Sequence, residues 1–142
     1  MGLVLCRFVG QIVGSMKHVK SDLRLIIRSQ NPITTFPNHI VTDKRVDIRI
    51  GTVPFDDLWK AGDVFLFPEK FNGLSLPLQE ARAAGMLVMC GDRFPMNQWL
   101  PREPLIPVLA YTRDRIGGCS PFDSAMFEPR QIAAKMDEWY GK

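Results

Sequence analysis

The strongest constraint on the fold lies in residues 61–85, where an apolar run is followed by a turn and then by a helical pattern. The run Val64–Phe67 is apolar throughout and is bounded by Gly62 and Pro68, which is typical of a strand covered on both faces. Pro77 near a first turn and apolar residues at helical spacing predict a helix that ends at a glycine. Because the backbone N–H groups of such a turn and the positive end of the helix converge, the segment predicts an anion site.

Strand and helix patterns alternate along the rest of the chain. Apolar runs predict strands at residues 23–27, 46–50, 64–67, 87–90 and 105–111, and helical spacing predicts helices at residues 3–19, 54–60, 76–84 and 129–140. In the first helix, Gly10 and Gly14 share one face, where missing side chains would allow a close approach to a sheet. Residues 29–43 read as a loop.

This alternation predicts a single α/β domain over residues 1–142, with a doubly wound parallel sheet and right-handed crossovers. Ligands of such sheets bind beyond the carboxyl ends of the strands. Arg28, Gly51, Lys70 and Gly91 should therefore lie together at that edge. Lys70 and Arg28 are candidate cationic partners of an anion bound at that edge.

Residues 72–81 read Asn-Gly-Leu-Ser-Leu-Pro-Leu-Gln-Glu-Ala. They resemble the donor-site signature of the retaining, two-domain (B-type) glycosyltransferases of family four, also called glycosyl transferases group 1. The usual form is Glu-Gly-Phe-Gly-Leu-Pro followed by Glu-Ala, and Asn72 and Glu80 are eight positions apart, as the paired glutamates are. The resemblance covers about residues 23–140 and implies a Rossmann-like, carboxy-terminal, donor-binding half. No segment resembles the amino-terminal, acceptor-binding half.

The resemblance implies a role for each matching residue. Glu80 matches the glutamate that accepts hydrogen bonds from the ribose hydroxyls, and Asn72 stands where the first glutamate contacts the sugar. Gly73, Leu74 and Ser75 match the loop whose amides hold the diphosphate. Lys70 and Arg28 are candidate further contacts of this diphosphate, since an anionic leaving group needs cations as well as amides. The change from glutamate to Asn72 keeps an acceptor, removes a charge and adds a donor. It bears on sugar placement more than on nucleotide binding.

The implied function is binding of a nucleoside diphosphate sugar, for retaining transfer of the sugar to an unknown acceptor without a metal or other cofactor. A separate amino-terminal half or a second copy of the chain would complete the active site, so whether the chain alone is an enzyme stays open. The alternative is a truncated or degenerate half that acts as a non-catalytic interaction module. A dinucleotide oxidoreductase is disfavoured because no G-x-G-x-x-G follows the first strand.

Composition excludes several other classes. The 142 residues are 46% hydrophobic with a net charge of only +3, which argues against nucleic-acid partners. No apolar run approaches a membrane span, and neither His18 nor His39 has metal ligands at a suitable spacing. The chain has three cysteines, an odd number that fits a reducing compartment, so we expect a cytoplasmic protein.

Overall fold

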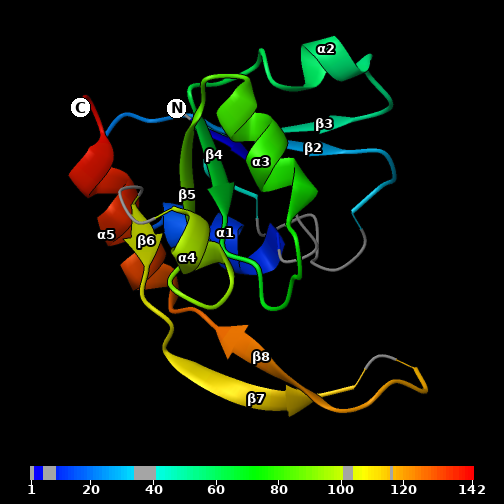
Figure 1. Cartoon of the computed structure of the whole chain (residues 1–142). Coiled ribbons are helices and arrows are strands. Elements are labelled where there is room, and N and C mark those ends of the chain that lie inside the picture. The colour runs from blue at the N-terminus through cyan, green and yellow to red at the C-terminus, as the bar shows by residue number, and fades with distance from the viewer. Residues whose placement is uncertain (1, 5–8, 34–40, 101–103, 116) are drawn as a thin grey trace.

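The computed structural model of the chain describes residues 2–4, 9–33, 41–100, 104–115 and 117–142. Its centre is a six-stranded sheet with the order β3-β2-β1-β4-β5-β6, in which every neighbouring pair is parallel (Figure 1). The strands are β1 (Gly2–Val4), β2 (Leu25–Ser29), β3 (Val46–Ile50), β4 (Val64–Phe67), β5 (Leu87–Gly91) and β6 (Leu105–Ile106). The chain is therefore an α/β protein built on a parallel sheet.

Helices cover both faces of this sheet (Figure 1). They are α1 (Val9–Met16), α2 (Phe55–Leu58), α3 (Leu76–Ala83), α4 (Met96–Trp99) and α5 (Pro129–Trp139). On β2, Leu25 and Ile27 pack with α1 and α5, whereas Ile26 between them belongs to the core formed with α3 and α4. The two-sided burial explains why the strand sequences are continuous apolar runs.

Most of the expected elements are confirmed. Strands β3 and β4 have the expected bounds, β5 extends one residue further, and β2 lies two residues later than expected. Helices α3 and α5 each end one residue earlier, and α5 buries Ile132 and Met136. The described residues of the 29–43 loop beyond the end of β2 contain no helix or strand, and residues 34–40 lie outside the described part.

The expectation of one helix over residues 3–19 is wrong at its start. Leu3 and Val4 belong to β1, and the helix begins only at Val9. Strand β1 pairs with β2 on one side and with β4 on the other. The apolar residues at this end of the chain fit a strand as well as a helix. Because β1 is paired with a strand on each side, the pairing decides in favour of the strand.

The expected role of Gly10 and Gly14 is also wrong. A Cβ atom added to either glycine would meet nothing within 4 Å, so neither permits a close approach. Helix α1 instead packs through larger buried side chains, among them Ile12 and Met16.

The single strand expected over residues 105–111 is wrong as well. Strand β6 ends at Ile106, directly before Pro107, which has no N–H for a ladder. The chain then forms a separate antiparallel hairpin of β7 (Ala110–Asp114) and β8 (Phe122–Met126). Figure 1 shows this hairpin beyond the carboxyl ends of the sheet strands.

None of the helices in the described ranges is both long enough and apolar enough to cross a membrane.

Candidate functional site at the carboxyl edge of the sheet

The carboxyl ends of the strands converge as the sequence predicts. Arg28 and Gly91 lie at the ends of β2 and β5, and Gly51 and Lys70 follow β3 and β4. Successive strands run outward from β1 to β3, and the chain then returns to β4 on the other side of β1. In open α/β sheets, ligands bind at the carboxyl edge where the strand order reverses in this way. Here that point lies between β1 and β4, so the segment after β4 is placed to bind a ligand.

Residues 68–75 form the β4–α3 turn, and Asn72 fastens it. The Asn72 Oδ1 atom accepts a hydrogen bond from the Ser75 N–H at 2.9 Å, and Nδ2 donates to Glu69 Oε2 at 2.8 Å. Gln79 Nε2 donates to the Leu74 carbonyl at 2.7 Å. Both ends of the Asn72 amide are therefore used within the turn. The side chain expected to face a sugar shapes the turn in this structure.

Ser75 is the residue from which helix α3 starts, and its backbone is left-handed, with φ 50° and ψ 57°. That conformation is uncommon for a residue with a side chain, and such residues cluster at ligand sites. Ser75 is only 3% exposed, and its hydroxyl makes no cap and has no hydrogen-bond partner among the described residues. A polar atom buried without a partner is costly unless another group satisfies it.

Several backbone donors of the same turn are open. No residue in the described part of the chain accepts a hydrogen bond from the N–H groups of Gly73, Leu74 or Leu76. Pro77, the next residue of the helix, has no N–H to contribute. Open N–H groups before a helix, together with its positive end, favour an anion. Of the three residues whose amides were expected to hold a diphosphate, Gly73 and Leu74 have open N–H groups, whereas the Ser75 N–H already donates to Asn72.

Glu80 lies away from this turn. It is five residues beyond Ser75, about 7 Å along the helix axis. With Phe55, Trp59 and Lys60 it lines a groove of about 460 Å³ between α2 and α3. The structure therefore brings Glu80 beside α2 rather than into contact with Asn72. A ligand that reaches both residues would have to extend along α3.

The two expected cations lie on different elements. Lys70 lies in the turn itself, where its carbonyl accepts hydrogen bonds from Arg93 Nη1 and from the Ala125 N–H, both at 2.8 Å. Arg28 is half-buried on β2 beside Arg49 of β3, and its Nε has no partner. Strand β1 separates β2 from β4, so Arg28 is about 10 Å across the sheet from the strand that leads into the turn.

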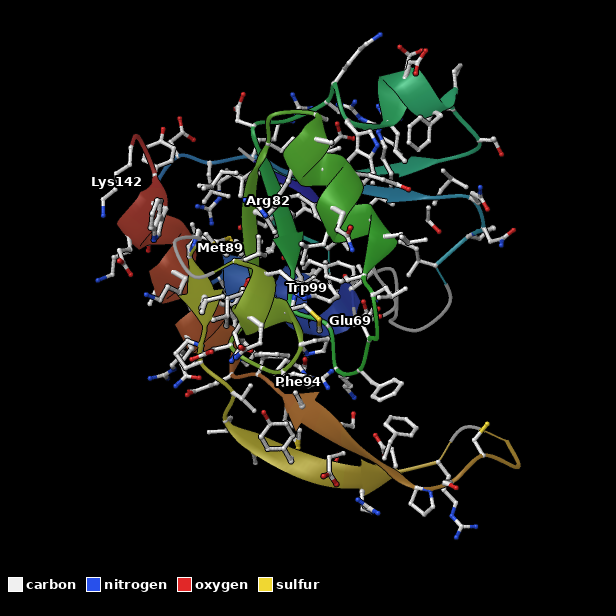
Figure 2. All side chains as sticks on the ribbon, in the orientation of Figure 1. Glu69, Arg82, Met89, Phe94, Trp99 and Lys142 are labelled. Carbon is white, nitrogen blue, oxygen red and sulfur yellow. The ribbon has the colours of Figure 1, made fainter. Side chains whose placement is uncertain are left out.

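Arg93 is a residue of this edge that sequence reasoning missed. It follows β5 and is only 8% exposed, yet it carries a guanidinium. Its Nη1 atom donates to the Lys70 carbonyl, and its Cζ lies 5.7 Å from the centroid of the Phe71 ring. Figure 2 shows the neighbouring Phe94 and Glu69 at the same end of the molecule, toward the hairpin. The only sequence signal was an arginine directly after a strand, and that signal does not reveal burial.

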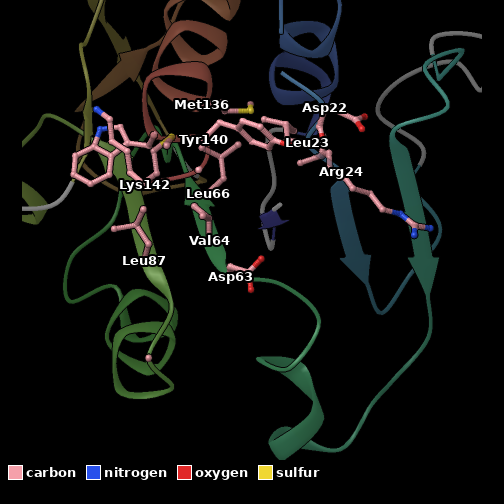
Figure 3. A pocket seen from close by; sticks show the side chains of 15 residues that line it. Asp22, Leu23, Arg24, Asp63, Val64, Leu66, Leu87, Met136, Tyr140 and Lys142 are labelled. Carbon is pink, nitrogen blue, oxygen red and sulfur yellow. Dashed lines mark hydrogen bonds between the residues drawn. The ribbon is translucent and has the colours of Figure 1, made fainter. Parts of the chain in front are cut away.

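A larger groove lies at the opposite, amino edge of the sheet (Figure 3). It measures about 630 Å³ and is lined by Met136 and Trp139 of α5 and by Leu66 of β4. Asp22, Arg24, Asp63 and Lys142 also line it, so acidic and basic groups are balanced there. This groove is larger than the one beside Glu80, but its walls are mainly apolar, and its two cations, Arg24 and Lys142, are matched by two carboxylates. Its size alone does not make it the better candidate for a charged ligand.

Comparison of the chain with protein-family models, with curated proteins and with solved structures returned no significant match. Within the described ranges, no three His, Cys, Asp or Glu side chains are grouped so that they could hold a metal ion.

Proposed function

We propose that the chain binds a nucleoside diphosphate sugar at the carboxyl edge of its sheet, as the donor-binding domain of a retaining glycosyltransferase. The observation that carries the proposal is the β4–α3 turn. It lies at the reversal of strand order and presents the unpartnered N–H groups of Gly73, Leu74 and Leu76 in front of a helix. Such a turn favours a diphosphate over a neutral ligand.

The topology supports the same proposal. The strand order β3-β2-β1-β4-β5-β6 is the order of Rossmann-type sheets, which bind nucleotides at this edge. We therefore assign the domain to the Rossmann-like class. Fold alone does not select a glycosyltransferase, because many activities share such sheets. That part of the proposal rests on the resemblance of residues 72–81 to the donor-site signature.

The proposal gives the residues distinct roles. The diphosphate binds the open amides of the turn, and the nucleoside extends along α3 so that its ribose hydroxyls reach Glu80. A carboxylate that accepts two hydrogen bonds from a vicinal diol gives specificity without a metal. Asn72 acts by fixing the turn through Ser75 and Glu69. When the sugar is transferred, the turn and the helix end stabilise the departing diphosphate.

A second candidate function is a non-catalytic interaction module. It is favoured by large apolar side chains that are exposed at this same end, among them Phe94, at 73%, and Leu74, at 68%. Exposed apolar side chains in a group mark interaction surfaces. The two functions differ in one simple respect, because only the first requires affinity for a nucleotide.

Thermal unfolding with a panel of ribonucleoside diphosphates distinguishes the two functions. A ligand at one hundred times its dissociation constant stabilises a folded protein by about 2.7 kcal/mol. We expect one nucleoside diphosphate to raise the midpoint clearly above the value for its nucleoside. No rise with any member of the panel would favour the interaction module.

The variant Glu80→Ala tests the placement of the nucleoside. We expect it to weaken nucleotide binding by about 1.5–3 kcal/mol, the scale of hydrogen bonds to a charged group. Isothermal calorimetry is the measurement. Glu138→Ala, which removes an exposed carboxylate from α5, is the matched control and should bind like the parent. Equal affinities of the parent and Glu80→Ala would remove Glu80 from the site.

A further inference from the structure

The guanidinium of Arg93 is largely buried and forms no direct ion pair within the described part of the chain. The residue is 8% exposed, and its Nε atom has no hydrogen-bond partner among the described residues. Its Nη1 atom contacts the neutral Lys70 carbonyl at 2.8 Å, and its Cζ atom lies 5.7 Å from the centroid of the Phe71 ring. Charged side chains are rarely buried in this way unless they are paired.

The surroundings of Arg93 disfavour its charge. Desolvation by burial lowers the pKa of Arg93, while the nearby Tyr111 and Glu69 act in the opposite direction and are outweighed. Arginine nevertheless stays protonated in proteins, so the cost of burying the cation has to be offset by a partner. Glu69 acts on Arg93 only from a distance, because the two side chains form no ion pair.

The position of Arg93 indicates what the partner is. Its Nη1 atom contacts Lys70, three residues before the open N–H group of Gly73. The Ala125 N–H donates to the same carbonyl, so β8 of the hairpin fixes this part of the turn. The buried cation therefore contacts the same turn that carries the open amides, at one edge of the sheet.

We propose that Arg93 binds a phosphate of the ligand held by the β4–α3 turn. The proposal rests on the proposed function and extends it, because it assigns the diphosphate to Arg93 instead of to the side chains of Lys70 and Arg28. The planar guanidinium donates two parallel hydrogen bonds to a phosphate, which a lysine ammonium does not. The phosphate pairs with the charge and accepts from the unpartnered Nε. Phe71, which lies over the guanidinium and is 46% exposed, has to turn aside to admit it.

The test compares a charged with an uncharged ligand. Arg93→Gln should lower the affinity for the nucleoside diphosphate that stabilises the parent chain by about tenfold or more. The affinity for the corresponding nucleoside should stay within about twofold. A merely structural role of Arg93 would change both affinities alike. Arg113→Gln, on the exposed side of the hairpin, is the matched control and should leave both affinities unchanged.

The outcomes separate this inference from the proposed function. If the parent chain binds no nucleoside diphosphate, the proposed function fails. If the parent binds one and Arg93→Gln keeps the parent's ratio of diphosphate to nucleoside affinity, only the role of Arg93 is overturned. If Arg93→Gln does not fold, the Arg93 Nε–H resonance of the parent is followed during titration with inorganic pyrophosphate. A saturable shift of that resonance supports the inference, and an unchanged resonance contradicts it.

Discussion

At the scale of single residues, the β4–α3 turn depends on one side chain. Asn72 accepts from the Ser75 N–H and donates to Glu69, so it replaces backbone partners that a turn lacks. Asn72→Ala should therefore lower the free energy of unfolding by about 1–2 kcal/mol. Urea denaturation measures the loss. Asn72→Asp keeps the acceptor but faces Glu69 with a like charge, and equal stability of the aspartate variant and the parent would contradict these contacts.

The residue scale also shows the limits of reading a sequence. Gly73, Leu74 and Ser75 could be placed in a turn because they are adjacent and precede a helical pattern. Arg93 could not, because it reaches Lys70 only through the fold and lies in a segment rich in glycine and proline. Burial of a charge depends on distant side chains, and no local pattern encodes it.

At the scale of elements, helix α1 carries a glycine that packing does not require. Gly14 lies inside the helix, and an added Cβ would meet nothing within 4 Å. Gly14→Ala should raise the free energy of unfolding by about 0.5–1 kcal/mol, because alanine loses less backbone entropy in a helix. Chemical denaturation of the parent and of Gly14→Ala measures this difference in the free energy of unfolding. A destabilised variant would show that α1 does approach a neighbour closely through Gly14.

Helix α5 is anchored to the segment before β2 by a carboxylate. Asp137 accepts from the Lys20 N–H and from the N–H and hydroxyl of Ser21. Burial acts to raise the pKa of Asp137, but these hydrogen bonds outweigh it and hold the pKa below the ordinary value of 3.8. A carboxyl with a lower pKa in the folded state stabilises the fold above the unfolded pKa, and this contribution is lost as the pH falls through the folded pKa.

Asp137→Ala should therefore cost about 1.5–3 kcal/mol of stability at pH 7 and less at pH 3. The free energy of unfolding of both proteins at the two pH values is the measurement. A difference that stays constant between pH 7 and pH 3 would contradict the role of the ionised carboxylate.

The order of elements was easier to predict than their pairing. The repeated strand and helix patterns of residues 46–90 specified a parallel α/β unit, because each period is local. The hairpin of β7 and β8 was not predicted, because residues 110–114 read Ala-Tyr-Thr-Arg-Asp and this sequence lacks an apolar face. Strand β1 was also missed, since three residues become a strand only between two longer neighbours.

At the scale of the whole molecule, the proposed function gives the described chain one wall of an active site. In that proposal the carboxyl edge of the sheet binds the donor, but sugar transfer also needs an acceptor held at the anomeric carbon. Such positioning accounts for about 7–11 kcal/mol of barrier lowering. We therefore expect the 142-residue chain alone to transfer no sugar from a radiolabelled donor to mixed acceptors. Robust transfer would show that a second copy of the chain supplies the missing wall or that the active site lies elsewhere.

The two edges of the sheet favour different kinds of ligand. The carboxyl edge offers open amides and the buried Arg93, whereas the amino-edge groove offers apolar walls around Leu66 and Met136. A nucleoside diphosphate carries most of its binding energy in charged groups, so it should select the carboxyl edge in spite of the larger volume at the other edge.

Nitrogen-15 NMR of the labelled chain, titrated with each ribonucleoside diphosphate in turn, distinguishes these edges residue by residue. We predict that one diphosphate produces saturable shifts that are largest at the amides of Gly73, Leu74 and Leu76 and at the Arg93 Nε–H. No shift with any diphosphate, or shifts that are largest around Leu23 and Trp139 in the amino-edge groove, would contradict the placement of an anion site at the β4–α3 turn.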